Sequence, residues 1–504
     1  MKYFLTLIQL WVGFLSICAS YPKANIWIIP SVESPQVYRN YAQTSKVHLE
    51  MARGEVEHIQ LVFPSKVNEE YRFTFDRYLK GIQISARELK KMNGYYDALV
   101  PFKNQLKCTD TLTAVWITVQ CPSRVPVGKY HQTIKIEGSK HFTIQLDYNV
   151  HHTTIPLKSS IPITVGVENR CMTEGLNDKE ADKERQRWVD FVLSYRMTPV
   201  FGTQITPERW QYEHSFSPWA WNDKRSIRLL NDRRYSCYML PFFTLSENEL
   251  ASLLCNIQKK GKLKESLFYI WDEPAYMEDY EQIKRKVNII RKYASDARIL
   301  TTFFCGPRNG PRKGDLYAVF DYLKHHIHVA TISLAPCKGN EEEVQHIRYK
   351  VPEGIDWWSY VCWQPGGNEP NFLLQMKGIQ QRAVMWRTWK NGSQGFLYWN
   401  CNIYHKRNPF TYITDMPHGD GILIYPGDIL GCKGPIASAR LERWRDGAEE
   451  MELLRLVEKN YSKEKADTLL NIVYSSPLSF IEKAHNIPFF RKELLDQLDK
   501  TIPI

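Results

Sequence analysis

Apolar and polar residues alternate one by one through short runs in the first third of the chain. The clearest runs cover residues 47–51, 57–63, 113–119, 132–136 and 141–146. A period of two places successive side chains on opposite faces of a strand, and short strands separated by Gly, Pro and Asn are typical of two packed sheets. We therefore expect an N-terminal β-sandwich over residues 21–158.

From about residue 160 the pattern changes, and apolar runs alternate with segments of helical periodicity. Eight such runs cover residues 161–167, 199–202, 235–243, 267–271, 299–304, 329–334, 356–362 and 395–399. A helix is predicted over 279–293, where Tyr280, Ile283, Val287 and Ile290 recur at helical spacing. Strands that alternate with helices indicate a parallel sheet, and eight units indicate a (β/α)₈ TIM-like barrel over residues 159–460. The helical pattern in the sequence is weak after the second and seventh runs.

The end of the chain is helical. Amphipathic patterns run through residues 441–457, 463–473 and 491–498. We expect the first to complete the barrel and a C-terminal helical segment, residues 461–504, to cap it. The predicted fold class is thus a multidomain α/β and β protein with a β-sandwich, a barrel and C-terminal helices.

The first 20 residues predict a secretory signal peptide. Lys2 precedes an apolar run of about 14 residues, which is shorter than the ~20 that span a bilayer, and small residues follow at positions 18–20. Cys18 also lies in an imperfect lipoprotein box, so plain cleavage and lipidation at Cys18 both stay open. We expect a secreted, periplasmic or cell-surface protein that meets a membrane only through such an anchor.

Charge and cysteine content exclude some classes of partner and site. The net charge is +11, but basic and acidic residues are interleaved and no nucleic-acid-binding signature occurs, so we expect no nucleic-acid partner. Ten cysteines follow Cys18 without a CxxC pair, which favours buried free thiols, with one or two disulfides as an alternative. The histidines of 325–328 precede the sixth strand, at the wrong end of a barrel for a site, so neither a metal nor a cofactor is expected.

Two adjacent carboxylates follow the fourth apolar run directly. Asp272 and Glu273 would lie at the carboxyl end of a barrel strand, where barrel active sites are found, although the start of an exposed loop is the plainer alternative. Glycoside hydrolysis commonly uses two carboxylates from different strands. The other strand ends offer only Glu168 as a rival, with Glu369 further out. An adjacent pair without a separate nucleophile suits a substrate whose own 2-acetamido group attacks the anomeric carbon. Glu273 would then be the general acid/base, and Asp272 would orient the acetamido group.

Aromatic and amide side chains gather at the same predicted end of the barrel. The substrate-binding candidates are Trp271, Tyr360, Trp363, Tyr398, Trp399, Asn400 and Asn402. Trp and Tyr rings can form the walls of a sugar pocket and Asn can bind hydroxyls, although packing is the alternative for about half of them. Asp420, in the turn 418–421, either reaches the rim of the pocket or serves the turn alone.

Several motifs together resemble glycoside hydrolase family 123. They are YIWDEP (269–274), GFLYWN (395–400), GDGILIYPG (419–427) and SARLERWRDG (438–447), with ARGE (52–55) and PVGKY (126–130) in the β-region. The resemblance implies a retaining β-N-acetylgalactosaminidase that acts on glycans with a terminal β-linked N-acetylhexosamine through an oxazolinium intermediate. It also implies Glu273 as general acid/base and Asp272 as the residue that orients the acetamido group.

Two other functions stay open at this point. One is a glycosidase for sugars without an acetamido group, with a remote nucleophile such as Glu168. The other is a surface glycan-binding protein without catalysis. The intact Asp272–Glu273 pair argues against a pure binding protein, because such a protein has little use for two neighbouring acids.

Overall fold

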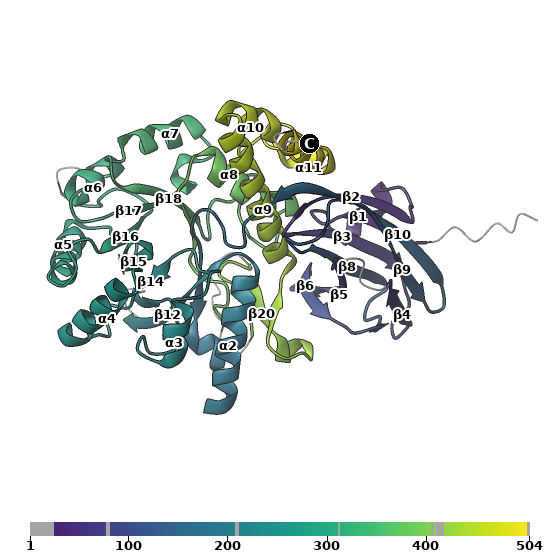
Figure 1. Ribbon diagram of the computed structural model, residues 1–504, viewed down its shortest axis with the longest axis horizontal. Coiled ribbons are helices and arrows are strands. Elements are labelled where there is room, and N and C mark those ends of the chain that lie inside the picture. The colour runs from purple at the N-terminus through teal and green to yellow at the C-terminus, as the bar shows by residue number, and fades with distance from the viewer. Residues whose placement is uncertain are drawn as a thin grey trace, which may run out of the picture.

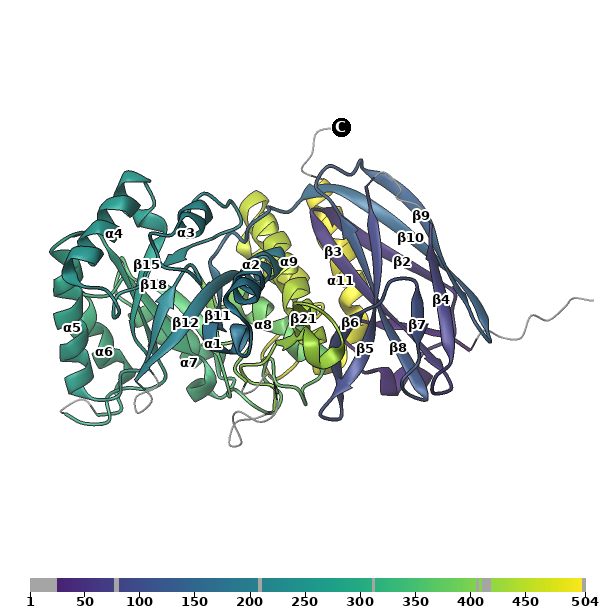
Figure 2. The same cartoon turned by 90° about the horizontal axis from the view of Figure 1, so that it is seen from below.

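A computed structural model describes residues 25–76, 81–206, 211–310, 313–404, 408–409 and 418–500. The predicted signal peptide and Cys18 lie outside these ranges. Figures 1 and 2 show a sheet-rich N-terminal region beside a larger α/β region, with C-terminal helices over the junction between them. The chain is therefore a multidomain α/β and β protein.

Two five-stranded sheets form the N-terminal region. The first has the order β1 (Trp27–Pro30), β3 (Glu55–Pro64), β8 (Leu112–Cys121), β5 (Gln83–Met92) and β6 (Tyr95–Pro101). The second has the order β2 (Lys46–Arg53), β10 (His141–Thr154), β9 (Gly128–Glu137), β4 (Glu70–Phe75) and β7 (Gln105–Lys107). The five alternating runs of the sequence fall within β2, β3, β8, β9 and β10, which confirms those strands.

The first sheet is buried on both of its faces. On one face Ile59 and Leu61 of β3 pack with Ile134 and Ile144 of the second sheet. On the other face residues such as Trp116 of β8 join the core of the α/β region. Nine of the ten residues of β3 are buried for this reason, and the sheet that joins the two regions has no solvent-facing side at this strand.

A nine-stranded sheet organises the α/β region. Its order is β13 (Gln211–Ser215), β12 (Thr198–Thr206), β11 (Ile163–Glu168), β19 (Phe396–Tyr398), β18 (Asp356–Val361), β17 (Val329–Ser333), β16 (Arg298–Phe303), β15 (Ser266–Trp271) and β14 (Tyr238–Met239). Neighbouring strands from β12 to β14 are parallel, and each of the eight predicted runs overlaps one of them. The predicted strand positions are confirmed.

The sheet is nearly closed rather than a ring of eight paired strands. After β12 the chain turns back as β13, which pairs antiparallel with β12. The gap between the two ends is bridged where the Phe216 N–H, just after β13, donates to the Met239 carbonyl of β14 at 2.6 Å. The prediction of an eight-stranded barrel missed β13, because its polar sequence gives no strand signal and its pairing forms only through the hairpin.

Helices cover the outside of this sheet. They are α1 (Asn169–Thr173), α2 (Asp178–Ser194), α3 (Lys224–Leu229), α4 (Glu247–Lys259), α5 (Met277–Arg291), α6 (Leu316–Leu323), α7 (Glu341–Lys350) and α8 (Gly378–Lys390). The predicted helix 279–293 is α5, which buries Tyr280, Ile283, Val287 and Ile290. Helix α8 gave a weak signal because it is buried at 12 of its 13 residues and so lacks a polar face.

Three further helices follow. They are α9 (Ala439–Asn460), α10 (Lys463–Leu470) and α11 (Ile487–Asp499). The expected amphipathic character of 441–457 is wrong, because nearly every residue of α9 from Ala439 to Val457 is buried. Helix α11 contacts α9 and also β2 and β10, so the C-terminal segment joins the two regions instead of capping the barrel alone (Figure 2). The predicted boundaries at residues 158 and 460 stay predictions.

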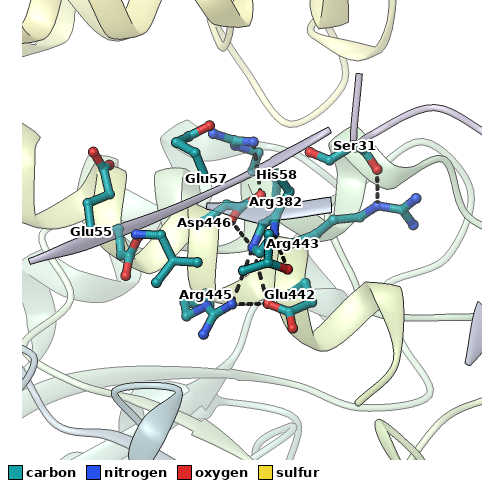
Figure 3. Close-up of polar contacts among 12 residues, drawn as sticks. Ser31, Glu55, Glu57, His58, Arg382, Glu442, Arg443, Arg445 and Asp446 are labelled. Carbon is teal, nitrogen blue, oxygen red and sulfur yellow. Dashed lines mark hydrogen bonds and ion pairs between the residues drawn. The ribbon is translucent and has the colours of Figure 1, made fainter. Parts of the chain in front are cut away.

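The buried acids of α9 are neutralised by bases from other elements. Arg382 of α8 binds both carboxylate oxygens of Glu450, at 2.6 and 2.9 Å, and Asp446 at 3.1 Å. His58 of β3 lies 3.1 Å from Glu442 and 3.3 Å from Asp446, as Figure 3 shows. A buried charge is tolerated only when it is paired and hydrogen-bonded. The buried ion pairs of α9 therefore connect the N-terminal region with the α/β region.

Helix α11 contributes to the same network of buried ion pairs. Its Arg491 lies 2.7 Å from Glu55 and 2.9 Å from Glu57, both on β3, and 3.5 Å from Glu450 of α9. Burial raises the pKa of Glu57 to about 8, an effect that Arg491 and Arg382 oppose. One strand and two helices, which are distant in the sequence, thus share a single buried network of charges.

The ten cysteines after Cys18 are all free thiols, and seven of them are buried. Free buried thiols were the favoured prediction, and the alternative of one or two disulfides is wrong. Within the described ranges, no group of three or more His, Cys, Asp and Glu side chains could hold a metal ion. None of the helices described there has the length and apolarity to cross a membrane.

Candidate active site

Strand alternation places a second, smaller core inside the barrel-like sheet. Leu267 and Tyr269 of β15, Leu300 of β16 and Tyr360 of β18 point into it, whereas their sequence neighbours pack outward under the helices. The inward side chains nearest the carboxyl ends of the strands are polar or aromatic. They form the floor beneath the loops that carry the predicted catalytic pair.

Asp272 is held in one orientation from below. Its Oδ1 accepts hydrogen bonds from the Tyr269 hydroxyl at 2.6 Å and from the Thr302 hydroxyl at 2.7 Å. Its Oδ2 has no hydrogen-bond partner among the residues that the structure describes. Asp272 itself is exposed at the mouth of the sheet. One carboxylate oxygen is therefore fixed by the protein and the other faces the site, available to a ligand.

Glu273 stands next to Asp272 in an uncommon backbone conformation. Its φ is 43°, in the left-handed region that a residue other than glycine seldom adopts, and such a position costs about 1–3 kcal/mol. Its N–H donates to the Thr302 hydroxyl at 3.0 Å, and Tyr360 donates its hydroxyl proton to Oε1. The register of β15 against β16 also shifts between Tyr269 and Trp271. These features hold the Glu273 side chain next to Asp272 at the end of β15.

The pKa of Glu273 is raised to about 7. Partial burial of its carboxyl group among the neighbouring side chains is the main cause, and the negative charge of Asp272 adds to it. The hydrogen bond from Tyr360 and the charge of Arg308 act in the opposite direction. A carboxyl group with this pKa is substantially protonated at neutral pH, which suits a group that must first give and later take a proton.

A small cavity of about 60 Å³ opens beside Asp272. Its lining includes Tyr212 and His214 of β13, and Tyr398, Trp399 and Asn400 at the end of β19. His214 stacks on Tyr269 with ring centroids 4.3 Å apart and 10° between the planes. Burial lowers the pKa of His214 to about 3, so its imidazole is neutral at ordinary pH.

The predicted substrate-binding residues separate into three groups. Tyr398, Trp399 and Asn400 line the cavity with Asp272, and Tyr360 binds Glu273 directly. Trp363 lies in the loop after β18 and is 44% exposed. Trp271 and Asn402 are buried away from the cavity lining. The structure thus brings together four of the seven candidates around the carboxyl pair.

Trp271 and Asn402 have clear structural partners. Trp271 packs into the core between the sheet and the helices. The Asn402 side chain accepts from the Glu168 N–H at 2.8 Å and donates to the Glu168 carbonyl at 3.2 Å, which ties β11 to the loop after β19. Each of these side chains is therefore engaged by the protein, and a sugar contact by either stays a prediction.

Glu168, the rival carboxylate, and the more distant Glu369 are both engaged elsewhere. Glu168 is buried and caps α1, where its Oε1 accepts from the Arg170 N–H at 3.2 Å, and burial raises its pKa. Glu369 forms an ion pair with Arg387 at 2.8 Å. Neither residue appears in the lining of the cavity beside Asp272. Asp272 is the carboxylate in that lining, and Glu273 stands next to it in the chain.

Asp420 supports the cavity wall from behind. Its Oδ1 accepts from the Tyr398 hydroxyl at 3.0 Å and from the Trp399 indole N–H at 3.1 Å. Burial raises the pKa of Asp420 to about 6. The turn that carries Asp420 therefore serves the site by holding two aromatic side chains of its wall.

Four residues of the site were absent from the predicted set: Tyr212, His214, Tyr269 and Thr302. Tyr269 and Thr302 could have been found, because they lie on the predicted strands 267–271 and 299–304 and alternation points them inward. Tyr212 and His214 carried no usable signal, since they enter the site only through the hairpin of β12 and β13.

A carboxyl group with a pKa near 7 beside a fixed carboxylate, at the strand ends of a barrel-like sheet, is an arrangement that suits acid–base hydrolysis. The family model described as "Glycoside hydrolase 123, catalytic domain" matches residues 183–457, more than half of the chain. The chain belongs to glycoside hydrolase family 123, and it is a glycoside hydrolase that acts on glycans.

A solved structure agrees with the fold over nearly the whole chain. A family 123 glycoside hydrolase from Clostridium perfringens, described for glycolipid glycan hydrolysis, aligns with a TM-score of 0.65 at 13% identity and covers 94% of this chain and 98% of that one. A β-galacturonidase from Eisenbergiella tayi aligns with a TM-score of 0.34 at 8% identity, covering 79% and 90% of the two chains. No curated protein sequence matches the chain.

Proposed function

We propose that this enzyme removes terminal β-linked N-acetylgalactosamine, or a related N-acetylhexosamine, from glycans with retention of configuration. The proposal rests on one observation: two adjacent carboxyl groups have different surroundings. Glu273 has a pKa near 7, whereas Asp272 has one oxygen fixed by two hydroxyls and the other open to the site. The first suits proton transfer, and the second suits binding an N–H and stabilising positive charge.

In the first step the carbonyl oxygen of the substrate's 2-acetamido group attacks the anomeric carbon. The bond to the leaving group breaks as Glu273 gives its proton to the departing oxygen. The acetamido group closes into an oxazolinium ion, whose N–H donates to Oδ2 of Asp272. The developing positive charge thus lies against a carboxylate that is already in place, so little reorganisation is needed.

In the second step water attacks the anomeric carbon and reopens the five-membered ring. Glu273, now a carboxylate, takes the proton of that water, and the acetamido group is restored. Two successive inversions at the anomeric carbon leave the product with the configuration of the substrate. One acid/base and no protein nucleophile suffice, which fits the engagement of Glu168 and Glu369 by other parts of the protein.

The cavity beside Asp272, at about 60 Å³, is large enough for an acetamido group and not for a whole sugar, so the ring of the cleaved sugar would lie at its mouth. Tyr398, Trp399 and Asn400 offer rings for the apolar face of the sugar and an amide for its hydroxyls. The relative from Clostridium perfringens is described for glycolipid glycan hydrolysis, which supports a glycan or glycoconjugate as the substrate. The predicted leader, residues 1–20, supports a secreted, periplasmic or cell-surface enzyme, with a lipid on Cys18 as the form that would tie it to a membrane.

Hydrolysis of three nitrophenyl glycosides tests this function. The sugars are β-N-acetylgalactosamine, β-N-acetylglucosamine and β-galactose. We expect cleavage of an acetamido sugar and none of β-galactoside, because only the former carries the internal nucleophile. Equal cleavage of plain galactoside would contradict substrate assistance and indicate a carboxylate nucleophile. Binding of the acetamido sugars without any turnover would instead indicate a glycan-binding protein.

A further inference from the structure

A cavity of about 700 Å³, which we call the junction cavity, lies between the N-terminal region and the α/β region. The N-terminal region lines it with η1 (Pro35–Asn40), the residues before η1 and the turn from β5 to β6. Further lining residues come from the start of α8, from residues 374–377 and from η6 (Ile481–Asn486). The junction cavity shares no lining residue with the cavity beside Asp272. Ligand pockets have volumes of ~300–1,000 Å³ and often form between domains, so the junction cavity is large enough for a ligand.

Arg443 of α9 lines the junction cavity as a buried cation. It is 5% exposed, and none of the carboxylates that the structure describes forms an ion pair with it. Figure 3 shows its guanidinium group extended away from the buried acids of α9 and toward Ser31. It donates to the Ser31 carbonyl and the Gln381 side-chain oxygen, each at 2.8 Å, and to the Glu33 carbonyl at 3.4 Å. A guanidinium group has five N–H bonds, so two of them have no partner among the described residues.

The surroundings of Arg443 fix the position of these N–H groups. Gly378, at the start of α8, packs against the guanidinium group, and a Cβ atom at this position would lie only 2.6 Å from Nε. The ring of Trp116 lies 5.6 Å from Cζ. Burial lowers the pKa of Arg443 to about 10, an effect that the charges of nearby carboxylates oppose, so the group is charged at neutral pH. A further hydrogen-bond acceptor would stabilise this buried charge.

Three other side chains bring a carboxylate, a ring and an amide to the same lining. Glu33 supplies the carboxylate, and burial together with the charge of Glu33 raises the pKa of Tyr41 beside it to about 12. Tyr95, at the start of β6, is 42% exposed. Gln375 is exposed as well. An exposed ring in the lining of a cavity is available to a ligand, and the amide can both donate and accept.

The remaining charges of the lining are paired, apart from one exposed histidine. Asp97 binds a buried arginine of α9, and Lys377 lies 3.0 Å from Glu482. Glu33 and Arg443 are thus the two groups of opposite charge that have no ion pair among the described residues. An anionic ligand would meet Glu33 and a cationic ligand would meet Arg443, so neither sign of charge is favoured. A hydroxyl group both donates and accepts, so it satisfies both residues.

We propose that the junction cavity is a carbohydrate-binding site, separate from the catalytic one, that holds a neutral oligosaccharide without cleaving it. Arg443 donates to hydroxyls of the saccharide, and the Glu33 carboxylate accepts from them. Tyr95 packs against the apolar C–H face of a sugar ring. The catalytic carboxyl pair lies outside this lining, so the site keeps the enzyme on a glycan and does not select the bond that is cleaved. The inference goes beyond the proposed function and needs no part of its mechanism.

Binding to an array of neutral oligosaccharides, with their sialylated and sulfated counterparts, tests the proposal. The protein is the Glu273→Gln variant, which leaves the glycans uncut, and calorimetry then gives Kd for those that bind. We expect binding of a neutral glycan that Tyr95→Ala, made in the same background, weakens by roughly 10-fold. Tyr95→Phe should retain most of the affinity, because it keeps the ring. Tyr95→Ala alone should cleave a nitrophenyl glycoside at the wild-type rate.

The matched control is Tyr349→Ala, which removes a ring that is 89% exposed on α7 and lies outside the lining. It should leave Kd unchanged. The proposal is overturned if no neutral glycan binds, if Tyr95→Ala leaves every Kd unchanged, or if the acidic counterparts bind more tightly than the neutral glycans. Because the array measures binding, its outcome is independent of which nitrophenyl glycoside the enzyme cleaves. A failure of the proposed function would appear in that hydrolysis instead.

Discussion

Glu273→Gln is expected to lower kcat/KM by roughly 10²- to 10⁴-fold for a substrate with a sugar leaving group. Glutamine keeps the shape of the side chain and can still accept from Tyr360, but its amide is not acidic and cannot protonate the departing oxygen. The loss should be smaller for a nitrophenyl glycoside, because nitrophenolate leaves without protonation. Steady-state kinetics on both substrates measures the difference.

The pH profile sharpens this prediction. Glu273 must be protonated to act, and its pKa is raised to about 7, so kcat/KM of the wild type should fall as the pH rises through about 7. The same limb should be absent from Glu273→Gln. Glu281→Gln is the matched control, since Glu281 is exposed on α5 and pairs with Lys284 at 2.9 Å on the surface. A normal rate or an unchanged pH limb in Glu273→Gln would show that another group donates the proton.

Arg382→Met should destabilise the protein by about 3–5 kcal/mol, because it leaves buried carboxylates without their cation. Arg382 binds both oxygens of Glu450 and one oxygen of Asp446, and all three side chains are at most 3% exposed. The methionine fills a similar volume, so the loss reports the charge and not a cavity. Denaturant unfolding followed by tryptophan fluorescence measures it.

Lys377→Met is the control for Arg382→Met. Lys377 also pairs with a carboxylate, Glu482 at 3.0 Å, but both side chains are largely exposed, so the expected change is about 0–1 kcal/mol. The double variant Arg382→Met/Glu450→Gln should recover part of the loss, because it removes one of the stranded charges. If Arg382→Met and Lys377→Met lowered the free energy of unfolding equally, the buried ion pairs of Arg382 would stabilise the protein no more than a surface pair does.

Local periodicity was sufficient to predict the parallel strands of the α/β region and the position of the carboxyl pair. The strand 267–271 is apolar throughout because it is buried on both faces. Catalytic residues of a parallel barrel lie at the carboxyl ends of such strands. Asp272 and Glu273 could therefore be placed at the mouth of the sheet from the sequence alone. Tyr269 and Thr302, which fix them, follow from the same alternation.

Contacts between distant segments could not be predicted in this way. The charges of Glu442 and Asp446 suggest a solvent-facing side of a helix, yet both are buried because Arg87, His58 and Arg382 reach them from other elements. His214 enters the site on a hairpin whose sequence is polar. For α9 the deciding partners lie far away in the chain, where neither periodicity nor spacing carries information about them. For His214 the polar sequence of β13 hides a strand that pairs with the strand before it, β12.

The most direct test of the central claim varies the nucleophile inside the substrate. A series of nitrophenyl β-galactosaminides with N-acetyl, N-fluoroacetyl, N-difluoroacetyl and N-trifluoroacetyl groups makes the carbonyl oxygen progressively less nucleophilic with little change in size. If the acetamido group attacks the anomeric carbon beside Asp272, kcat/KM should fall steeply at each step. A rate that is independent of fluorination would contradict the account and show that the nucleophile belongs to the protein.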